Sequence, residues 1–69
     1  MDIPTHGVRA LRLSKVIEKT GISRSQLFRM VKAGKFPRSY HLTETGSISA
    51  WDEAEVDAWL TSKFSESRS

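Results

Sequence analysis

The chain has 69 residues, of which 38% are apolar and 28% charged, and it contains no cysteine. These values exclude a disulfide framework and a cysteine-based zinc site, and no apolar run approaches the roughly 20 residues that a membrane helix needs. We expect one small globular domain, short of the roughly 70–80 residues at which a core is stable without help from a partner. Residues 1–4 have neither the basic nor the apolar region of a signal peptide, which favours a cytoplasmic protein.

Charge is divided unevenly along the sequence. Residues 1–43 contain nine Lys or Arg against two acidic residues, a net charge of +7, whereas residues 44–69 contain two against six, a net charge of −4. This division favours a molecule with one basic face for a polyanion such as nucleic acid. It also arises by chance in small soluble domains, so the charge alone leaves both readings open.

Residues 1–12 are expected to form an N-terminal arm, in which 9–13 alternate weakly, as in a short strand or an extended lead-in. A first helix is predicted over 14–20, with Ser14 as its N-cap. Gly21 suits the left-handed position after the helix, and Ile17 and Ile22 would be the contact pair of a Schellman motif.

A second helix is predicted over 23–33. Ser23 and Gln26 have the spacing of a capping box, and Gly34 suits the position after the helix end. One face is apolar and the opposite face is mainly polar. The apolar face consists of Leu27, Met30 and Val31, and the opposite face of Ser25, Phe28, Arg29 and Lys32.

One β-hairpin is predicted over 39–51. Pro37 forces the residue before it out of the helical region, and the turn signal at 44–46 separates two alternating segments. Four side chains of this hairpin compete for its buried side: Tyr40, Leu42, Ile48 and Trp51.

A third helix is predicted from Asp52 to about Lys63. Asp52 and Glu55 have the spacing of a second capping box, and acidic residues suit the positive end of the helix dipole. The apolar side of this helix consists of Val56, Trp59, Leu60 and Phe64. Residues 65–69 are expected to be a disordered polar tail.

The order of elements predicts a mainly α-helical domain with a small β-hairpin over 13–64. Two helices joined by a tight turn, a hairpin and a third helix are the plan of a winged helix-turn-helix. We expect the core to consist largely of Leu13, Val16, Ile17, Leu27, Val31, Phe36, Ile48, Trp51, Val56, Trp59 and Leu60. For Trp59, the alternative is a contact between protomers.

The second helix is the candidate reader of double-stranded DNA. In a helix-turn-helix its N-terminal residues meet base edges in the major groove, where Arg pairs with guanine, Gln with adenine and Ser with either. The alternative for the basic face of this helix is that it is only solvated. The alternative for Phe28 is a position at the edge of the core, and the alternative for His41 is a solvent-exposed position on a strand. The expected contacts are Ser23, Arg24, Ser25, Gln26, Phe28, Arg29 and Lys32 on the recognition helix, and Arg12, Arg38, Tyr40 and His41 on the wing and backbone side.

The sequence also resembles the AlpA family of phage and prophage regulators, in the MerR-like and excisionase winged-helix group. The residues that carry the resemblance are LSKV at 13–16, TGISRSQLFR at 20–29, GKFP at 34–37 and WDEAEVDAWL at 51–60. The resemblance implies a phage, prophage or genomic-island protein that binds DNA as a transcriptional regulator. Some members of this group act as excisionases, recombination directionality factors that help an integrase, so the resemblance also allows that role.

The chain departs from this family at two places. Family members usually have Tyr where this chain has Phe28, and their wing is usually more basic than the tip here, which contains Glu44. We therefore expect the second helix to hold DNA more firmly than the wing. A DNA-binding domain this small contacts few base pairs, so several protomers are expected to bind adjacent sites.

No enzymatic activity, cofactor or metal is expected. His6 and His41 lie far apart in a chain without cysteine, which argues against a metal site. The acidic residues at 52–57 are better explained by helix capping and a solvated face than by acid–base catalysis. The rival hypothesis is a small protein-interaction adaptor, such as an anti-repressor or antitoxin-like subunit, which would use the acidic third helix with Trp51 and Trp59.

Overall fold

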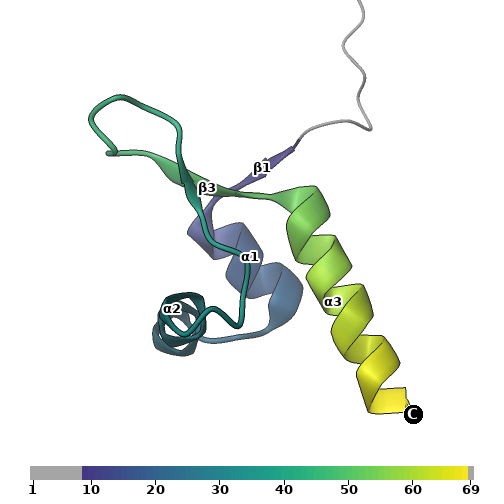
Figure 1. Ribbon diagram of the computed structural model, residues 1–69. Helices are drawn as coiled ribbons and strands as arrows, with labels where there is room; N and C mark the ends of the chain where they lie inside the picture. The colour runs from purple at the N-terminus through teal and green to yellow at the C-terminus, as the bar shows by residue number, and fades with distance from the viewer. Residues whose placement is uncertain (1–8, 69) are drawn as a thin grey trace, which may run out of the picture.

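The computed structural model of the chain describes residues 9–68, so the expected arm at 1–8 and the last residue of the expected tail lie outside it. Three helices and a small antiparallel sheet confirm the mainly α-helical prediction, in a layout compatible with a winged helix-turn-helix (Figure 1). The elements in chain order are β1 (Ala10–Leu11), α1 (Leu13–Thr20), α2 (Arg24–Lys32), β2 (Tyr40–His41), β3 (Ser49–Asp52) and α3 (Glu53–Arg68).

Helix α1 begins earlier than predicted. Arg12, not Ser14, is the N-cap, because its carbonyl already accepts the backbone N–H groups of Lys15 and Val16. Ser14 therefore lies inside the first turn, where its side chain does not cap the helix. The serine signal was misleading because Leu13, one residue before it, packs against the core and extends the helix backwards.

The predicted end of α1 at Gly21 is confirmed, with a different hydrogen bond. Gly21 has φ 74°, and its N–H donates to the carbonyl of Ile17 at 2.7 Å. This single bond is the αL motif rather than the expected Schellman motif. The N–H of Ile22, which a Schellman motif would use, donates instead to Thr20 Oγ1 at 3.2 Å.

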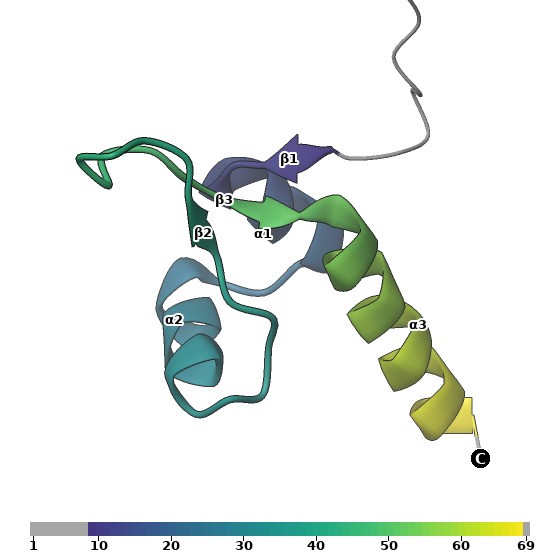
Figure 2. The ribbon, with the colours of Figure 1, turned by 45° about the horizontal axis from the view of Figure 1, so that its top comes forward.

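The sheet has three strands in the order β1-β3-β2, with both pairings antiparallel. Of the two possibilities for residues 9–13, a strand is therefore the one observed, and Leu11 pairs with Trp51. Strand β3 is central and leads directly into α3, so the sheet joins the wing hairpin to the third helix (Figures 1 and 2).

The core lies between this sheet and the helices, and most of the predicted side chains contribute to it. The buried hydrophobic residues are Leu11, Val16, Leu27, Phe36, Ala50, Trp51 and Val56, with Leu13, Ile22, Met30, Val31, Trp59 and Leu60 partly buried against them. Leu11 and Ala50 were not predicted. Ile17 is of intermediate burial.

The prediction of a buried Ile48 is wrong. Side chains alternate along the hairpin, so Ile48 lies on the face opposite Trp51, and it is 36% exposed because that face is covered at Ala50, close to the core, but not at position 48. Trp51 occupies the covered face, where its indole N–H donates to the carbonyl of Pro37 at 2.7 Å. Ile48, Tyr40 and Leu42 are left on the exposed face.

Helix α3 begins as predicted and ends later. Asp52 Oδ1 accepts the N–H of Ala54 at 3.1 Å, which caps the first turn. The expected end near Lys63 is wrong, since the helix continues to Arg68 and residues 65–68 of the expected tail are helical. This extension contains neither Gly nor Pro, and Lys63 and Ser62 both interact with Glu66 one turn later.

Ion pairs join α3 to the N-terminal half of the chain. Lys19 Nζ lies 2.7 Å from Asp57 Oδ1 and 2.9 Å from Glu53 Oε2, and Arg9 Nε lies 3.3 Å from Glu53 Oε1. The hydrogen bond to Asp57, followed by that to Glu53, raises the pKa of Lys19 above its usual 10.5. Glu53 and Asp57 of α3 thus pair with Lys19 of α1 and with Arg9, the residue before β1. Within residues 9–68, no helix is long and apolar enough to cross a membrane.

We predict that Leu27→Ala destabilises the domain far more than Ile48→Ala. Leu27 is fully buried, so the truncation removes transfer free energy and leaves a cavity, at a cost of about 2–5 kcal/mol. The truncation at the exposed position 48 serves as the matched control. Thermal and urea unfolding measure both changes, and equal losses of stability would contradict the observed choice of buried face.

Candidate nucleic-acid interface

Helix α2 starts at a capped N-terminus that the preceding turn fixes against α1. Ser23 has extended backbone angles, and its Oγ accepts the N–H of Gln26 at 3.4 Å. Only Ile22 separates Ser23 from the left-handed Gly21, and Ile22 packs against the core. The first turn of α2 is therefore held in a defined direction relative to α1 (Figure 2).

One side of α2 is buried and the other is open. Leu27 is fully buried and Met30 and Val31 are partly buried. Phe28 is 46% exposed, so neither full burial nor a purely solvated position describes it. The other predicted contact residues of this helix and its cap are all exposed: Ser23, Arg24, Ser25, Gln26, Arg29 and Lys32.

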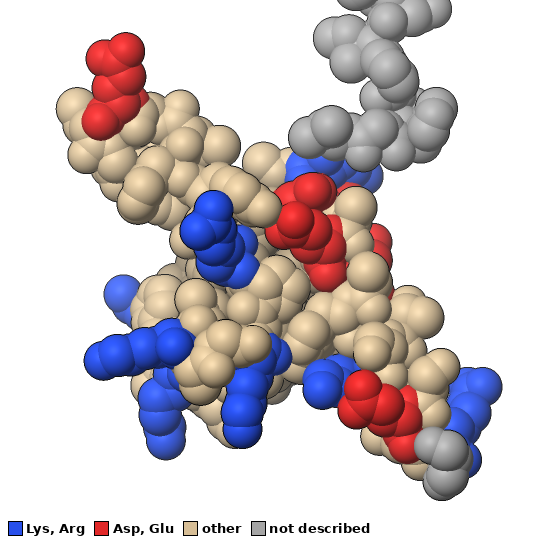
Figure 3. Space-filling view, viewed as in Figure 1, with Lys and Arg blue, Asp and Glu red and all other residues tan. Residues whose placement is uncertain are grey.

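The cations of α2 differ from those of α1 in having no acidic partner. Toward the described residues, Arg24, Arg29 and Lys32 form no ion pair within 4.0 Å, whereas Lys15 and Lys19 of α1 each do. In Figure 3, Lys and Arg side chains gather around α2 with no acidic side chain among them, while acidic side chains lie over α3 and at the wing tip. Toward the described residues, the unpaired cations of the N-terminal half are thus the three of α2 together with Arg12, Lys35 and Arg38.

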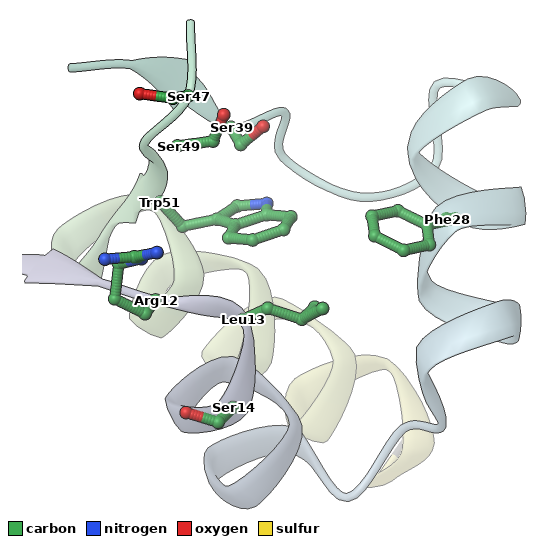
Figure 4. A pocket seen from close by; sticks show the side chains of 8 residues that line it. All are labelled: Arg12, Leu13, Ser14, Phe28, Ser39, Ser47, Ser49 and Trp51. Carbon is green, nitrogen blue, oxygen red and sulfur yellow. The ribbon is translucent and has the colours of Figure 1, made fainter. Parts of the chain in front are cut away.

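A groove of about 510 Å³ connects α2 to the hairpin between β2 and β3. Phe28 lies on one side of it and faces Trp51 across the groove, with Arg12 beside the entrance to α1 (Figure 4). The lining residues are Arg12, Leu13, Ser14, Phe28, Ser39, Ser47, Ser49 and Trp51. One cation, four hydroxyls and no acidic residue suit a sugar–phosphate strand, because hydroxyls and guanidinium donate hydrogen bonds to phosphate oxygens.

The structure divides the predicted α2 residues between two flanks of the helix. Phe28 lines the groove, and the Arg24 guanidinium lies 5.8 Å from the Phe28 ring centroid. Gln26 and Arg29 instead line a second hollow of about 340 Å³, which Lys35 also borders. Helical geometry causes this split, since residues two positions apart lie on nearly opposite sides of a helix.

The predicted wing residues are also divided. Arg12 lines the groove, but Arg38 and Tyr40 do not. The Arg38 guanidinium lies 5.6 Å from the Tyr40 ring centroid, and the Tyr40 hydroxyl donates to the Glu55 carboxylate. His41 Nδ1 lies 3.1 Å from Ser49 Oγ, which links the two strands.

The sequence reasoning missed the serine face of the hairpin. Ser39, Ser47 and Ser49 all line the groove. The signal was present, because Ser47 and Ser49 alternate with apolar residues and share the face of Trp51. At the tip, the hydroxyls of Thr43, Thr45 and Ser47 lie within 3.4 Å of one another, and Glu44 is exposed.

The adaptor hypothesis depends on Trp51 and Trp59, and both side chains pack and form hydrogen bonds within this domain. Trp51 is buried with its indole N–H bound to Pro37. The Trp59 ring meets the Phe36 ring edge-on at 4.7 Å between centroids, and its N–H donates to the carbonyl of Lys35 at 2.8 Å. Among residues 9–68, no group of three or more His, Cys, Asp or Glu is placed to hold a metal ion.

Comparison with known proteins identifies the family. Residues 9–64 match the family described as prophage CP4-57 regulatory protein (AlpA). The chain is similar to the uncharacterized protein ORF88 of Enterobacteria phage P4, with 34% identity over 56 residues, which are 81% of this chain and 61% of that relative. No solved structure matches the chain closely. Because the family match spans most of its length, the chain belongs to the AlpA family of prophage regulatory proteins.

Proposed function

We propose that the protein is a prophage regulator that binds double-stranded DNA in a sequence-specific way, with α2 as the recognition helix. The observation that carries the proposal is the set of α2 cations without acidic partners among the described residues, on a capped helix that follows a tight turn. Phosphate neutralisation by such cations supplies most of the affinity of DNA-binding proteins. Membership of a regulatory family supports the same conclusion.

In this proposal, the first turn of α2 reads bases and the later cations hold phosphates. Arg24 and Ser25 are exposed at the helix start, where recognition helices meet base edges. Gln26 lies on the opposite flank from Phe28 and would read the neighbouring base step. Arg29 and Lys32, one turn further along, would contact the DNA backbone.

The serine-lined groove would receive the backbone strand next to the major groove that α2 enters. Arg12 is its one cation, and Ser39, Ser47 and Ser49 are its hydroxyl donors on the hairpin. The wing would therefore contribute hydrogen bonds more than charge. This fits a domain in which the recognition helix carries most of the affinity.

We propose transcriptional regulation, excision of the element with an integrase, or both as the output, with several protomers on adjacent sites. Nuclease footprinting across the promoter of a neighbouring integrase gene and its attachment site tests this. Protection of the promoter alone indicates regulation, and protection of the attachment site indicates a role in recombination. No protection of either, together with no binding to random duplex at low salt, would favour the adaptor hypothesis.

The first prediction for this interface contrasts Arg24→Ala with Lys32→Ala. Loss of a base contact at Arg24 should cost about 1–3 kcal/mol on the specific site and little on random DNA. Loss of a phosphate contact at Lys32 should weaken both and reduce the salt slope by about one unit. Affinities at several salt concentrations measure these effects. Binding of both variants like the parent would exclude α2 as the reader.

The second prediction concerns the sign of the wing charge. Glu44 is the acidic residue at the wing tip, so Glu44→Lys should tighten binding to specific and random DNA alike. The gain should be larger at low salt, because the Debye length is about 10 Å at 0.1 M ionic strength. Glu44→Gln is the control that removes the charge without reversing it. Unaltered affinity for both variants at low salt would place the wing tip away from DNA.

The third prediction concerns the groove. Arg12→Ala should weaken binding without changing sequence preference, because a backbone contact carries no base information. Lys15→Ala is the matched control on the same helix, since Lys15 is paired with Glu18 at 3.3 Å and does not line the groove. Equal effects of the two substitutions would contradict the assignment of a strand to the groove.

A further inference from the structure

The tip of the wing, residues 38–51, projects from the body of the molecule, whereas Ala50 and Trp51 at its base are buried (Figures 1 and 2). Strand β2 has two residues and lies at the edge of the sheet, where it pairs with β3. Tyr40, Leu42 and Ile48 are exposed on one face of the hairpin. Apolar burial on that face is therefore limited to Ala50, the residue paired with Tyr40, and does not extend along the wing.

A side-chain hydrogen bond joins this wing to α3. The Tyr40 hydroxyl donates to Glu55, with distances of 3.0 Å to Oε2 and 3.2 Å to Oε1. Glu55 lies in the first turn of α3, whose N-terminus is capped by Asp52, so its carboxylate is available for Tyr40. The sequence pattern had assigned Glu55 to a capping box.

Two neighbouring contacts show that this bond lies at the base of the wing. The Trp51 indole N–H donates to Pro37 on the covered face of the sheet, and Tyr40 bonds to Glu55 from the exposed face. The Arg38 guanidinium rests over the Tyr40 ring. Loss of the Tyr40 hydroxyl would therefore release the edge strand from α3 while the ring under Arg38 and the pairing with β3 stay in place.

We propose that Glu55 is a positioning residue for the wing and acts through Tyr40 to hold the serine face of the hairpin toward the groove beside α2. The benefit to DNA binding rests on the function proposed above. The bond to Tyr40 favours binding by ordering the wing, whereas the negative charge of Glu55 opposes binding by repelling phosphate. Substitutions that separate the bond from the charge therefore have opposite signs.

The bond itself can be tested in the free protein. Tyr40 is the one tyrosine of the chain, so the ultraviolet absorbance of phenolate reports it alone. The hydrogen bond to Glu55 raises the pKa of Tyr40 above its usual 10.0, so Glu55→Ala should lower it. In Tyr40→Phe, exchange of the Leu42 amide, whose N–H donates to the carbonyl of Ile48 at 2.8 Å, should speed up while exchange in α1 stays as in the parent. An unchanged phenol pKa in Glu55→Ala, or unchanged exchange in Tyr40→Phe, would overturn the proposal.

The effect on DNA is measured with random duplex at two salt concentrations. Tyr40→Phe removes the bond and no charge, so it should weaken binding between about twofold and tenfold, as expected for loss of one hydrogen bond. Glu55→Gln and Glu55→Ala both remove the repulsion, but only Gln keeps an acceptor for the Tyr40 hydroxyl, so Glu55→Gln should bind more tightly than Glu55→Ala. The pair Glu66→Gln and Glu66→Ala, at the far end of α3, is the charge-matched control and should show no such difference.

The outcomes separate this inference from the proposed function. If the parent binds no duplex at low salt, DNA binding fails, and the phenol titration and hydrogen exchange still decide whether Glu55 positions the wing. If the parent binds and Tyr40→Phe binds equally well, with Glu55→Gln and Glu55→Ala alike, the wing needs no such bond and the inference is wrong.

Discussion

The burial of Trp51 in the central strand is the constraint on which the rest of the structure depends. Its ring covers one face of the three-stranded sheet, and its N–H holds the carbonyl of Pro37 at the start of the hairpin. Strand β3 therefore pairs with β1 and β2 while its next residues begin α3. In so small a core, one large aromatic side chain decides which face of the hairpin is buried.

The direct connection of β3 to α3 also determines which charged residues lie close together. Because β3 runs directly into α3, the acidic first turns of α3 come to lie beside β1 and the end of α1, where Glu53 and Asp57 bind Arg9 and Lys19. Helix α2 lies away from this contact, so its cations stay unpaired toward the described residues. The modest net charge of +3 therefore conceals one strongly basic element, which is the physical basis of the DNA-binding proposal.

The wing is less suited to hold DNA than α2. Its groove side presents hydroxyls rather than cations, and its tip contains an exposed acid. Hydroxyl contacts need close and ordered geometry, because they weaken steeply with distance and angle, whereas a cation acts over a longer range. In the DNA complex that we propose, the orientation of the wing would therefore matter more than its charge, and the bond between Tyr40 and Glu55 is a contact that bears on this orientation.

The sequence by itself determined the elements whose signals are local. The Ser23 cap, the left-handed glycines at 21 and 34, the Asp52 cap and the buried Leu27 and Val56 all follow from residues within one or two turns of one another. The exposed basic face of α2, and with it much of the candidate interface, was predictable because helical periodicity assigns it without reference to the rest of the chain.

Only the tertiary structure decided the features that join distant segments. The pairing of β1 with β3 shows that Leu11 is core, and the choice of Trp51 over Ile48 leaves the serines facing α2. The partner of Glu55 is fifteen positions away, so a local capping pattern could not predict it. Which flank of α2 meets the hairpin, and with it the separation of Gln26 from the groove, likewise depends on the placement of one element against another, which local propensity does not contain.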